Sequence, residues 1–423
     1  MSSLEQNNLQ AKIRKLLNDL ESVNTPSDDF EYLTVGDNFR SELLSLKQEI
    51  LALALERKKL EKIVKGGFGS GKTHFLSNLN WLLERDGDSK LIISRIDLSK
   101  LRSPDEFEFS IIREMKQIKG GNYVEVLRVA YENIKKEYVE SHSNVTSKQV
   151  EDFFATILFL LLGKATANAT NGFIDSEVLS ALGAKNSVER LANLLTGHAL
   201  NKLFAQTRSQ ARREDVEFVD RFIQIIKHPK LPIATAFEVP ARTLSRERQL
   251  TDVIFKALNF SGIQTIVILV DELETLKRFS EVNLRETLVT IRDFRDSFEA
   301  VGKTPGYPSI AFICASTESF FDETLRVEDP ALHDRWCWEQ KEVLLEPFSP
   351  ADIDNLIFKV RELFYLAGYQ LHPIKSSLEM SEHEIIQLRQ RMLEKYKDNR
   401  SELTTRRLVG NLIQEIKKIW IAS

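Results

Sequence analysis

Residues 66–73, GGFGSGKT, have the residue types and the spacing that are needed to hold phosphate groups. They satisfy the pattern G-x-x-x-x-G-K-S/T. Glycines let successive backbone N–H groups turn toward phosphate oxygens, and the helical pattern at 74–85 adds its positive end. We therefore predict a cradle for ATP and Mg²⁺, the alternative being a glycine-rich turn with an incidental lysine. The expected binding residues are Gly66, Gly67, Phe68, Gly69, Ser70, Gly71, Lys72, Thr73 and His74.

Two of these side chains have specific expected roles. Lys72 would reach the β- and γ-phosphates, and the Thr73 hydroxyl would ligate Mg²⁺. An apolar pair precedes the segment and an amphipathic pattern follows it, which is the context that a phosphate-binding loop requires.

An acidic pair ends the apolar run at 266–270, IVILV. A buried strand that ends in Asp271 and Glu272 is costly unless something cationic lies there. Asp271 would hold Mg²⁺ through water, and Glu272 would orient and activate the attacking water. A strand that emerges into solvent is the alternative. Glu274 either joins this site or is a solvated residue that opens the next helix.

A further apolar run at 310–315, IAFICA, is followed by Ser316 and Thr317. In an ATPase sheet this position adjoins the γ-phosphate, so a hydroxyl there can bond the attacking water or the phosphate. We expect Ser316 or Thr317 to be this sensor. Capping of the strand end is the alternative.

The composition is that of a globular protein with no general attraction to polyanions. The chain has 423 residues, 42% of them hydrophobic, and a formal net charge of -4. Cys314 and Cys337 are too few for a disulfide framework and wrongly spaced for a zinc cluster. The N-terminus lacks the features of a signal peptide, and the apolar run at 153–162 is too short to cross a bilayer. We expect a cytoplasmic protein without a membrane partner, in which 153–162 is a buried helix.

Five apolar, β-rich runs predict a parallel sheet with helices on both faces. They lie at 63–64, 91–96, 266–270, 310–315 and 343–345. The second and third runs are separated by about 160 residues, far more than one crossover needs. The predicted fold class is α/β: a P-loop NTPase with a five-stranded parallel sheet, a large helical insertion and a C-terminal helical lid.

Helical patterns complete the predicted organisation. They lie at 4–21, 38–59, 351–368, 381–397 and 404–420, and the first helix packs either on its own domain or on a partner. The expected parts are an N-terminal helix and linker at 1–32, the ATPase core at 33–100 and 261–348, the insertion at 101–260 and the lid at 349–423.

The order of the motifs resembles the AAA+ superfamily near its initiator and clamp-loader branch. The segments are GGFGSGKT, VILVDE, IAFICAST, ALHDRW, PFSPADI and TTRRLVGNLI. More narrowly, GSGKTHFL, VDELE and ALHDRW are similar to segments of the ATP-binding proteins of bacterial BREX-type phage-defence systems. The resemblance covers roughly residues 33–100 and 262–420.

The resemblance implies roles for three arginines. Arg335 in ALHDRW would correspond to an arginine finger, which acts on the site of a neighbouring subunit. It would lie beyond a helix-like stretch at 318–327 and a turn at 328–334, away from its own P-loop. Arg406 would be the lid arginine that senses nucleotide, or Arg407 would be, because Thr405 stands where relatives often carry proline. A surface arginine and a helix salt bridge are the alternatives. Initiator relatives also carry a winged helix after the lid; this chain ends at Ser423, so we do not expect autonomous DNA binding.

The leading interpretation is an AAA+-type ATPase that assembles with itself or with defence-system or DNA-processing proteins to remodel or license a complex. A nucleotide-gated switch with little hydrolysis is the main alternative, and a small-molecule kinase is a third. Basic clusters at 208–213 and 242–248 are interleaved with acids. They form either a solvated mixed-charge surface or a face that contacts DNA only in the assembled form.

Overall fold

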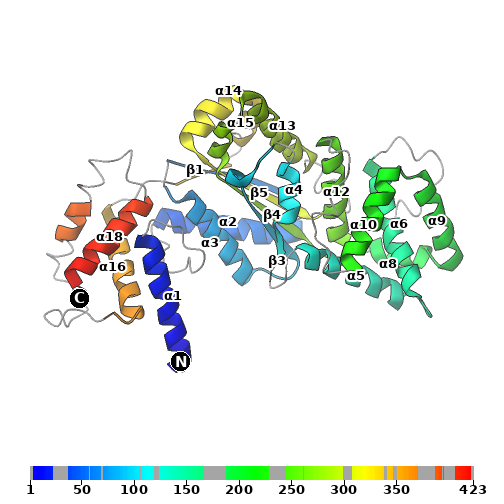
Figure 1. Cartoon of the computed structure of the whole chain (residues 1–423), viewed down its shortest axis with the longest axis horizontal. Helices are drawn as coiled ribbons and strands as arrows, with labels where there is room; N and C mark the ends of the chain where they lie inside the picture. The colour runs from blue at the N-terminus through cyan, green and yellow to red at the C-terminus, as the bar shows by residue number, and fades with distance from the viewer. Residues whose placement is uncertain are drawn as a thin grey trace.

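The computed structural model is a mixed α/β structure with one six-stranded sheet. It describes residues 3–21, 37–56, 58–67, 70–103, 106–118, 123–165, 187–227, 244–260, 262–298, 307–337, 341–345, 350–369, 386–392, 394 and 405–420. Figure 1 shows the sheet between two outlying groups of helices. Helices α1 (Ser3–Glu21), α16 (Pro350–Leu366) and α18 (Thr405–Trp420) lie on one side of it. On the other side lie α5 (Tyr123–Glu140), α6 (Ser147–Ala165), α8 (Ser187–Leu194), α9 (Gly197–Gln210) and α10 (Arg213–Lys227).

The sheet has the strand order β3-β2-β4-β5-β1-β6. Its strands are β1 (Lys59–Gly66), β2 (Leu91–Asp97), β3 (Met115–Gln117), β4 (Thr265–Asp271), β5 (Ser309–Thr317) and β6 (Glu342–Leu344). Every pairing is parallel except that of β3 with β2. The five parallel strands are the five predicted ones, but the prediction of a five-stranded sheet is wrong by one strand. Strand β3 was missed because it is a three-residue edge strand, MKQ, without an apolar run.

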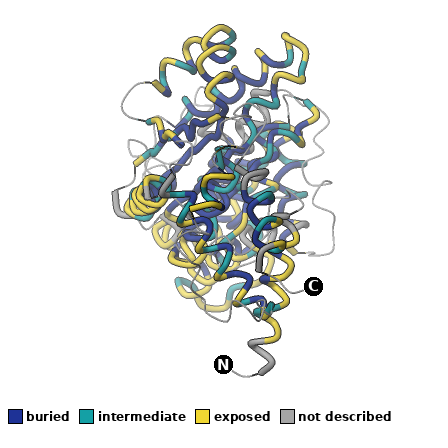
Figure 2. The backbone as a smooth tube through the Cα atoms, turned by 90° about the vertical axis from the view of Figure 1, so that its left-hand side faces the viewer, coloured by how far each residue is buried: buried dark blue, intermediate teal, exposed yellow. Residues whose placement is uncertain are grey.

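Both faces of the sheet are buried, as a parallel sheet requires. Along β4, Ile266 and Ile268 face a core that includes α4 (Glu106–Arg113), α12 (Leu244–Phe260) and α13 (Glu281–Ser297). Val267 and Leu269 face the opposite core, which α2 (Asp37–Glu56) and α3 (Lys72–Asp86) cover. Figure 2 shows buried residues along the central strands and exposed residues on the outlying helices.

Strand β1 is longer than its apolar pair suggested. Helix α2 ends at Glu56 rather than at residue 59, and the strand begins at Lys59. Glu61 and Lys65 are buried within the strand, and each is ion-paired: Glu61 with Arg295, and Lys65 with Asp322. Partners from other elements neutralise these charges, which is why charged residues can lie in a buried strand. The same charges interrupt the apolar pattern of β1, so the sequence predicted only Ile63 and Val64 as strand.

A large group of helices lies between β2 and β4 in the chain. It comprises α4, α5 (Tyr123–Glu140), α6 (Ser147–Ala165), α8 (Ser187–Leu194), α9 (Gly197–Gln210), α10 (Arg213–Lys227) and α12. Helix α6 contacts α5, α9, α10 and α12. Its residues 153–162 are buried, which confirms the expected buried helix. Since α4 and α12 belong to a core that continues onto the sheet, the insertion boundaries 101–260 stay a prediction.

The segment after β5 differs from its expected form. The chain continues as a turn of π-helix, η5 (Phe320–Leu325), then α14 (Arg326–Glu328) and α15 (Pro330–Cys337). We expected a turn over 328–334, and that expectation is wrong for most of the segment. Asp329 caps the new helix, because its carboxylate accepts from the Leu332 N–H at 3.0 Å.

The first and last described helices, α1 and α18, pack together, as Figure 1 shows. Ile13, Leu16 and Leu17 of α1 (Ser3–Glu21) are buried against α16 (Pro350–Leu366) and α18 (Thr405–Trp420). Residues 386–392 join the same core and are helical; the rest of the predicted helix 381–397, apart from residue 394, lies outside the described residues. The N-terminal helix therefore packs within its own chain, on the C-terminal helices.

Among the described helices, none combines the length and the apolar character that spanning a membrane would require.

Candidate functional site

The candidate phosphate cradle joins the end of β1 to the start of α3. Gly66 is the last residue of β1, and Gly71 immediately precedes the helix. A Cβ on Gly66 would lie 2.3 Å from the Ser70 Oγ, so a larger residue does not fit without a shift. Gly71 has φ of +96°, which L side chains rarely adopt. Both glycines are therefore required by the path of the backbone.

The candidate cradle has a buried polar atom that is available to a ligand oxygen. The Ser70 Oγ is buried and has no hydrogen-bond partner among the described residues. It lies next to the N-terminal end of α3, where backbone N–H groups and the helix dipole favour negative charge. Phe68 and Gly69, the other predicted cradle residues, lie outside the described part of the chain.

Lys72 is the first residue of α3, and its ammonium is held at the loop. The Lys72 Nζ donates to the carbonyl oxygens of Gly66 at 3.2 Å and Gly67 at 3.1 Å. Glu274 Oε1 lies 3.6 Å away. The structure thus brings the predicted lysine to the loop, where its positive charge faces two neutral carbonyl oxygens and one carboxylate.

Thr73 and Asp271 meet between α3 and the end of β4. The Thr73 Oγ1 donates to Asp271 Oδ1 at 3.3 Å. A hydroxyl and a carboxylate are the oxygen donors that Mg²⁺ prefers, and Mg²⁺ usually keeps several waters besides one or two protein ligands. The donor set fits that ion. The described residues contain no cluster of three or more His, Cys, Asp or Glu side chains that could hold a metal by themselves.

The Asp271 carboxylate is nearly buried but fully engaged. Its Oδ1 accepts from the Glu272 N–H at 3.0 Å as well as from Thr73, and its Oδ2 is paired with the Arg95 Nη2 at 3.3 Å. Burial raises the pKa of Asp271, whereas the charge and hydrogen bond of Arg95 act in the opposite direction. Arg95 therefore favours the ionised form that a metal ligand must have.

Glu272 directly follows β4 in a left-handed backbone conformation, with φ of 64° and ψ of 42°. Such a conformation costs a non-glycine residue about 1–3 kcal/mol and tends to cluster at functional sites. Burial raises the pKa of Glu272, and the negative charges of Glu274 and Asp271 raise it further. A half-buried carboxylate with a raised pKa can accept a proton near neutral pH more readily than an ordinary glutamate.

Glu274 lies on the short helix η3 (Leu273–Arg278), and it contacts two parts of the candidate site. Its Oε1 faces Lys72, and its Oε2 accepts from the Thr317 N–H at 3.2 Å. Of the two interpretations of Glu274, this geometry supports the one in which it joins the site.

The two sensor candidates are the last residues of β5 and are both buried. The Ser316 Oγ donates to the Thr317 carbonyl oxygen at 3.2 Å, and the Thr317 Oγ1 accepts from the Phe320 N–H at 3.3 Å. In register, Thr317 lies opposite Gly66 of the cradle. Strand order therefore brings these hydroxyl residues beside the loop, and the choice between them stays a prediction.

His74 lies in the first turn of α3, with its ring beside Phe39. Its Nε2 is 3.0 Å from the Asn78 Nδ2, and the His74 and Phe39 ring centroids are 5.8 Å apart. A Cβ added to Gly71 would lie 3.8 Å from the Phe39 Cε2. Phe39 was not among the predicted residues, because the sequence does not show which surface an aromatic residue of an amphipathic helix covers.

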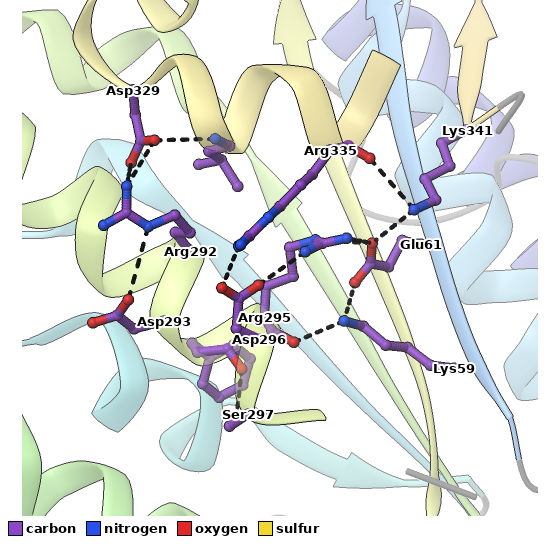
Figure 3. Close-up of polar contacts among 12 residues, drawn as sticks. Lys59, Glu61, Arg292, Asp293, Arg295, Asp296, Ser297, Asp329, Arg335 and Lys341 are labelled. Carbon is purple, nitrogen blue, oxygen red and sulfur yellow. Dashed lines mark hydrogen bonds and ion pairs between the residues drawn. The ribbon is translucent and has the colours of Figure 1, made fainter. Parts of the chain in front are cut away.

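Arg335 lies on α15 and is ion-paired with Asp296, as Figure 3 shows. Asp296 also accepts from Arg295, which in turn holds the buried Glu61 through two hydrogen bonds of 2.9 and 2.6 Å. Lys341 contacts Glu61 and the Arg335 carbonyl oxygen, each at 3.4 Å. The predicted finger is thus engaged within its own chain.

These contacts reach β1 near its amino end, whereas the cradle follows its carboxyl end. Glu61 precedes Gly66 by five residues, or about 16 Å along a strand. The structure therefore does not bring Arg335 into the group formed by Lys72, Thr73 and Asp271.

The lid arginines are described only in part. Arg406 and Arg407 lie in the first turn of α18, and the positions of their side chains are outside what the structure describes. Their predicted role as nucleotide sensors stays a prediction.

Arg95 was not predicted either. Its signal was present: a single charged residue interrupts the apolar run LIISRID two positions before the acidic end of the strand. An arginine in a buried strand needs an anionic partner nearby, and the neighbouring strand supplies Asp271.

Comparison with known proteins identifies one relationship. Residues 9–106 match a family model described as BREX system ATP-binding protein BrxC/D. This match includes α2, β1, α3 and β2, and it supports the resemblance to BREX ATP-binding proteins. Strand β4 with Asp271 lies outside it. Neither a curated protein nor a solved structure matches the chain.

Proposed function

We propose that this chain binds ATP together with Mg²⁺ in the cradle and hydrolyses it, as an AAA+-type ATPase. The observation that carries the proposal is the contact between Thr73 and Asp271, which joins the residue after the cradle lysine to the acidic end of β4. The ammonium of Lys72 supports it, and so does the Ser70 hydroxyl, which has no hydrogen-bond partner within the described part of the chain. The family match at residues 9–106 supports the ATP-binding part.

Each residue has a distinct task in the proposed reaction. Lys72 would turn from the loop carbonyls to the phosphates, and Thr73 with Asp271 would hold Mg²⁺, which when bound would supply positive charge at the phosphate oxygens. Glu272 takes a proton from water as that water's oxygen bonds to the γ-phosphorus. The bond from the γ-phosphorus to the bridging oxygen then breaks, and ADP leaves with the electron pair.

Assembly is part of the proposal. Arg335 would leave Asp296 and approach the γ-phosphate held by a neighbouring chain, so a monomer would turn over slowly. The ion pair of Arg335 within its own chain is consistent with such a dormant state. The main alternative is a switch that binds ATP with little hydrolysis. It differs from the proposed ATPase in that the assembled chains would retain ATP instead of hydrolysing it.

The biological role follows from the resemblance and the family match. We propose that the chain works in a BREX-type phage-defence system and acts with other proteins of that system in the cytoplasm. It would touch DNA only in the assembled form, because its net charge of -4 provides no general attraction to phosphates.

The test is to measure ATP hydrolysis and Mg²⁺-dependent nucleotide binding by the full chain over a range of protein concentrations. Turnover per chain that rises with concentration is expected. Binding without turnover at any concentration, including with the native partners, would leave the switch as the function. Absence of nucleotide binding would refute both. Phage plating on cells that carry wild-type or Lys72→Ala protein tests the defence role.

A further inference from the structure

Arg95 lies on β2, the strand between the edge strand β3 and the acidic strand β4. Strands β2 and β4 are parallel neighbours, with Arg95 opposite Leu269 and Asp97 opposite Asp271. Register partners on adjacent strands point to the same face of a sheet. Leu269 belongs to the core covered by α3. Arg95 therefore lies on the face of the sheet that carries the cradle helix.

The Arg95 guanidinium is ion-paired with Oδ2 of Asp271, the carboxylate oxygen that does not accept the hydrogen bond from Thr73. Its Nη2 is 3.3 Å from Asp271 Oδ2, while Oδ1 accepts from the Thr73 hydroxyl and the Glu272 N–H. The Asp271 side chain is 5% exposed and that of Arg95 is 35% exposed. One partner is thus fixed in the interior, and the other has a path to solvent.

Charge explains why a cation is needed there. Asp271, Glu272 and Asp97 gather at the carboxyl ends of β4 and β2. A nearly buried carboxylate among other acids is costly without a cation. Lys72 lies near Glu274, and Lys100 pairs with Asp97 at 3.3 Å. Among the described side chains, the cation ion-paired with Asp271 is Arg95.

Mg²⁺ would bring two positive charges to the same carboxylate. A guanidinium and a divalent ion at one small carboxylate repel each other, so the long, half-exposed arginine side chain is the one that can withdraw. We propose that Arg95 is a built-in counter-cation of Asp271, which Mg²⁺ displaces when the metal–nucleotide complex binds. This inference rests on the proposed function, because it needs the metal to bind at Thr73 and Asp271.

The proposal predicts the effect of neutralising Arg95. In Arg95→Gln, Asp271 loses its counter-cation, so metal-free protein should be less stable, by about 2–4 °C in its thermal midpoint. Mg²⁺ no longer competes with a positive charge. Mg²⁺ should therefore increase the nucleotide affinity of Arg95→Gln by a factor about tenfold larger than in the wild type. This size is expected from the removal of a unit charge a few ångströms from the metal.

The experiment compares dissociation constants for a fluorescent, non-hydrolysable ATP analogue in Mg²⁺ and in EDTA. The ratio of the two constants is the metal factor. Arg95→Lys retains the charge and should keep the wild-type factor. Lys100→Gln removes an exposed cation near the site and should also keep it, which separates a local exchange from a general change of charge.

The outcomes are distinct. A larger metal factor in Arg95→Gln only, with reduced stability of the metal-free protein, supports the exchange. An unchanged or smaller factor overturns it and makes Arg95 a residue that orients Asp271 instead. A wild-type protein with no metal factor would refute the metal site itself, and with it the metal part of the proposed function.

A second measurement needs no variant and applies even if Arg95→Gln does not fold. Phenylglyoxal modifies accessible arginine side chains, and mass spectrometry reports the extent at Arg95 in the wild-type chain. Modification should increase severalfold when Mg²⁺ is added to the nucleotide-bound protein. Protection of Arg95 under these conditions would place it on the ligand and overturn the exchange.

Discussion

The hydroxyl of Thr73 donates a hydrogen bond of 3.3 Å to Asp271, although 198 positions separate these two residues in the chain. The contact exists because β4 lies within two strands of β1 in the sheet, and because α3 begins at the carboxyl edge where β4 ends. It joins the two sequence motifs into one candidate site, and the following predictions test its parts.

Replacement of Lys72 by alanine should weaken nucleotide binding by at least about tenfold to a hundredfold, the worth of a hydrogen bond to a charged group. Isothermal titration of ATP into the folded variant measures this. Lys90→Ala, which removes an exposed lysine before β2, is the matched control and should bind normally. Wild-type affinity in Lys72→Ala would refute the cradle assignment.

Replacement of Glu272 by glutamine should retain bound ATP and reduce turnover by about a hundredfold or more, because an amide keeps the shape but cannot accept the proton. Turnover and retained nucleotide are measured on the same sample. If the variant hydrolyses ATP at the wild-type rate, the water-activating role belongs elsewhere, and Glu274 is the first residue to examine because it contacts Lys72.

The pH dependence of turnover should respond to Glu274. Burial and then the charge of Glu274 raise the pKa of Glu272, so the base stays protonated to a higher pH than an ordinary glutamate and activity rises with pH. Glu274→Gln removes one cause. The acid limb of the pH–rate profile should therefore move to lower pH, and the exposed Glu281→Gln should leave it in place. A shift to higher pH, or no shift, would contradict this electrostatic account.

The raised pKa of Glu272 should also make the free energy of unfolding depend on pH, with stability falling as pH rises. Folded protein holds the Glu272 proton more tightly than unfolded protein does, so this group stabilises the fold below its unfolded pKa. That stabilisation is lost as pH rises through the folded value. Glu274→Gln should bring the pKa of Glu272 in the folded protein closer to its value in the unfolded protein. Urea unfolding, measured from below the unfolded pKa to above the folded pKa, should therefore show a smaller loss of unfolding free energy than in the wild type.

Mixing Arg335→Ala with Lys72→Ala should recover ATPase activity that neither variant has alone. One chain contributes an intact cradle and the other an intact finger, and such fingers contribute about 10³-fold or more to turnover. Because Arg335 also pairs with Asp296, Asp296→Asn is the control: it removes the pair but keeps the finger. No recovery despite confirmed co-assembly would count against action between subunits.

Leu17→Ala in α1 should destabilise the C-terminal helices by about 2–5 kcal/mol, the cost of a cavity at a fully buried leucine. Amide hydrogen exchange in α16 and α18 should accelerate, while Lys15→Ala, exposed on the same helix, should leave it unchanged. Unaltered exchange in Leu17→Ala would mean that α1 does not stabilise this part of the chain.

The sequence by itself determined the elements whose signals are local. The glycine pattern at 66–73 depends on the conformational freedom of a few consecutive residues, and the apolar runs at 266–270 and 310–315 report strands buried on both faces. For the same reason, the amphipathic pattern of α1 predicted a helix and left open what it packs on.

Only the tertiary structure decided which distant residues meet. Arg95 reaches Asp271, Asp296 holds Arg335, and α1 covers α16 and α18, all through contacts between separate elements. Strand β1 shows the physical reason most directly. A charged residue such as Glu61 can lie inside a strand when Arg295, 234 positions away, neutralises it. No local pattern carries that information, because the partner enters through strand order and helix packing.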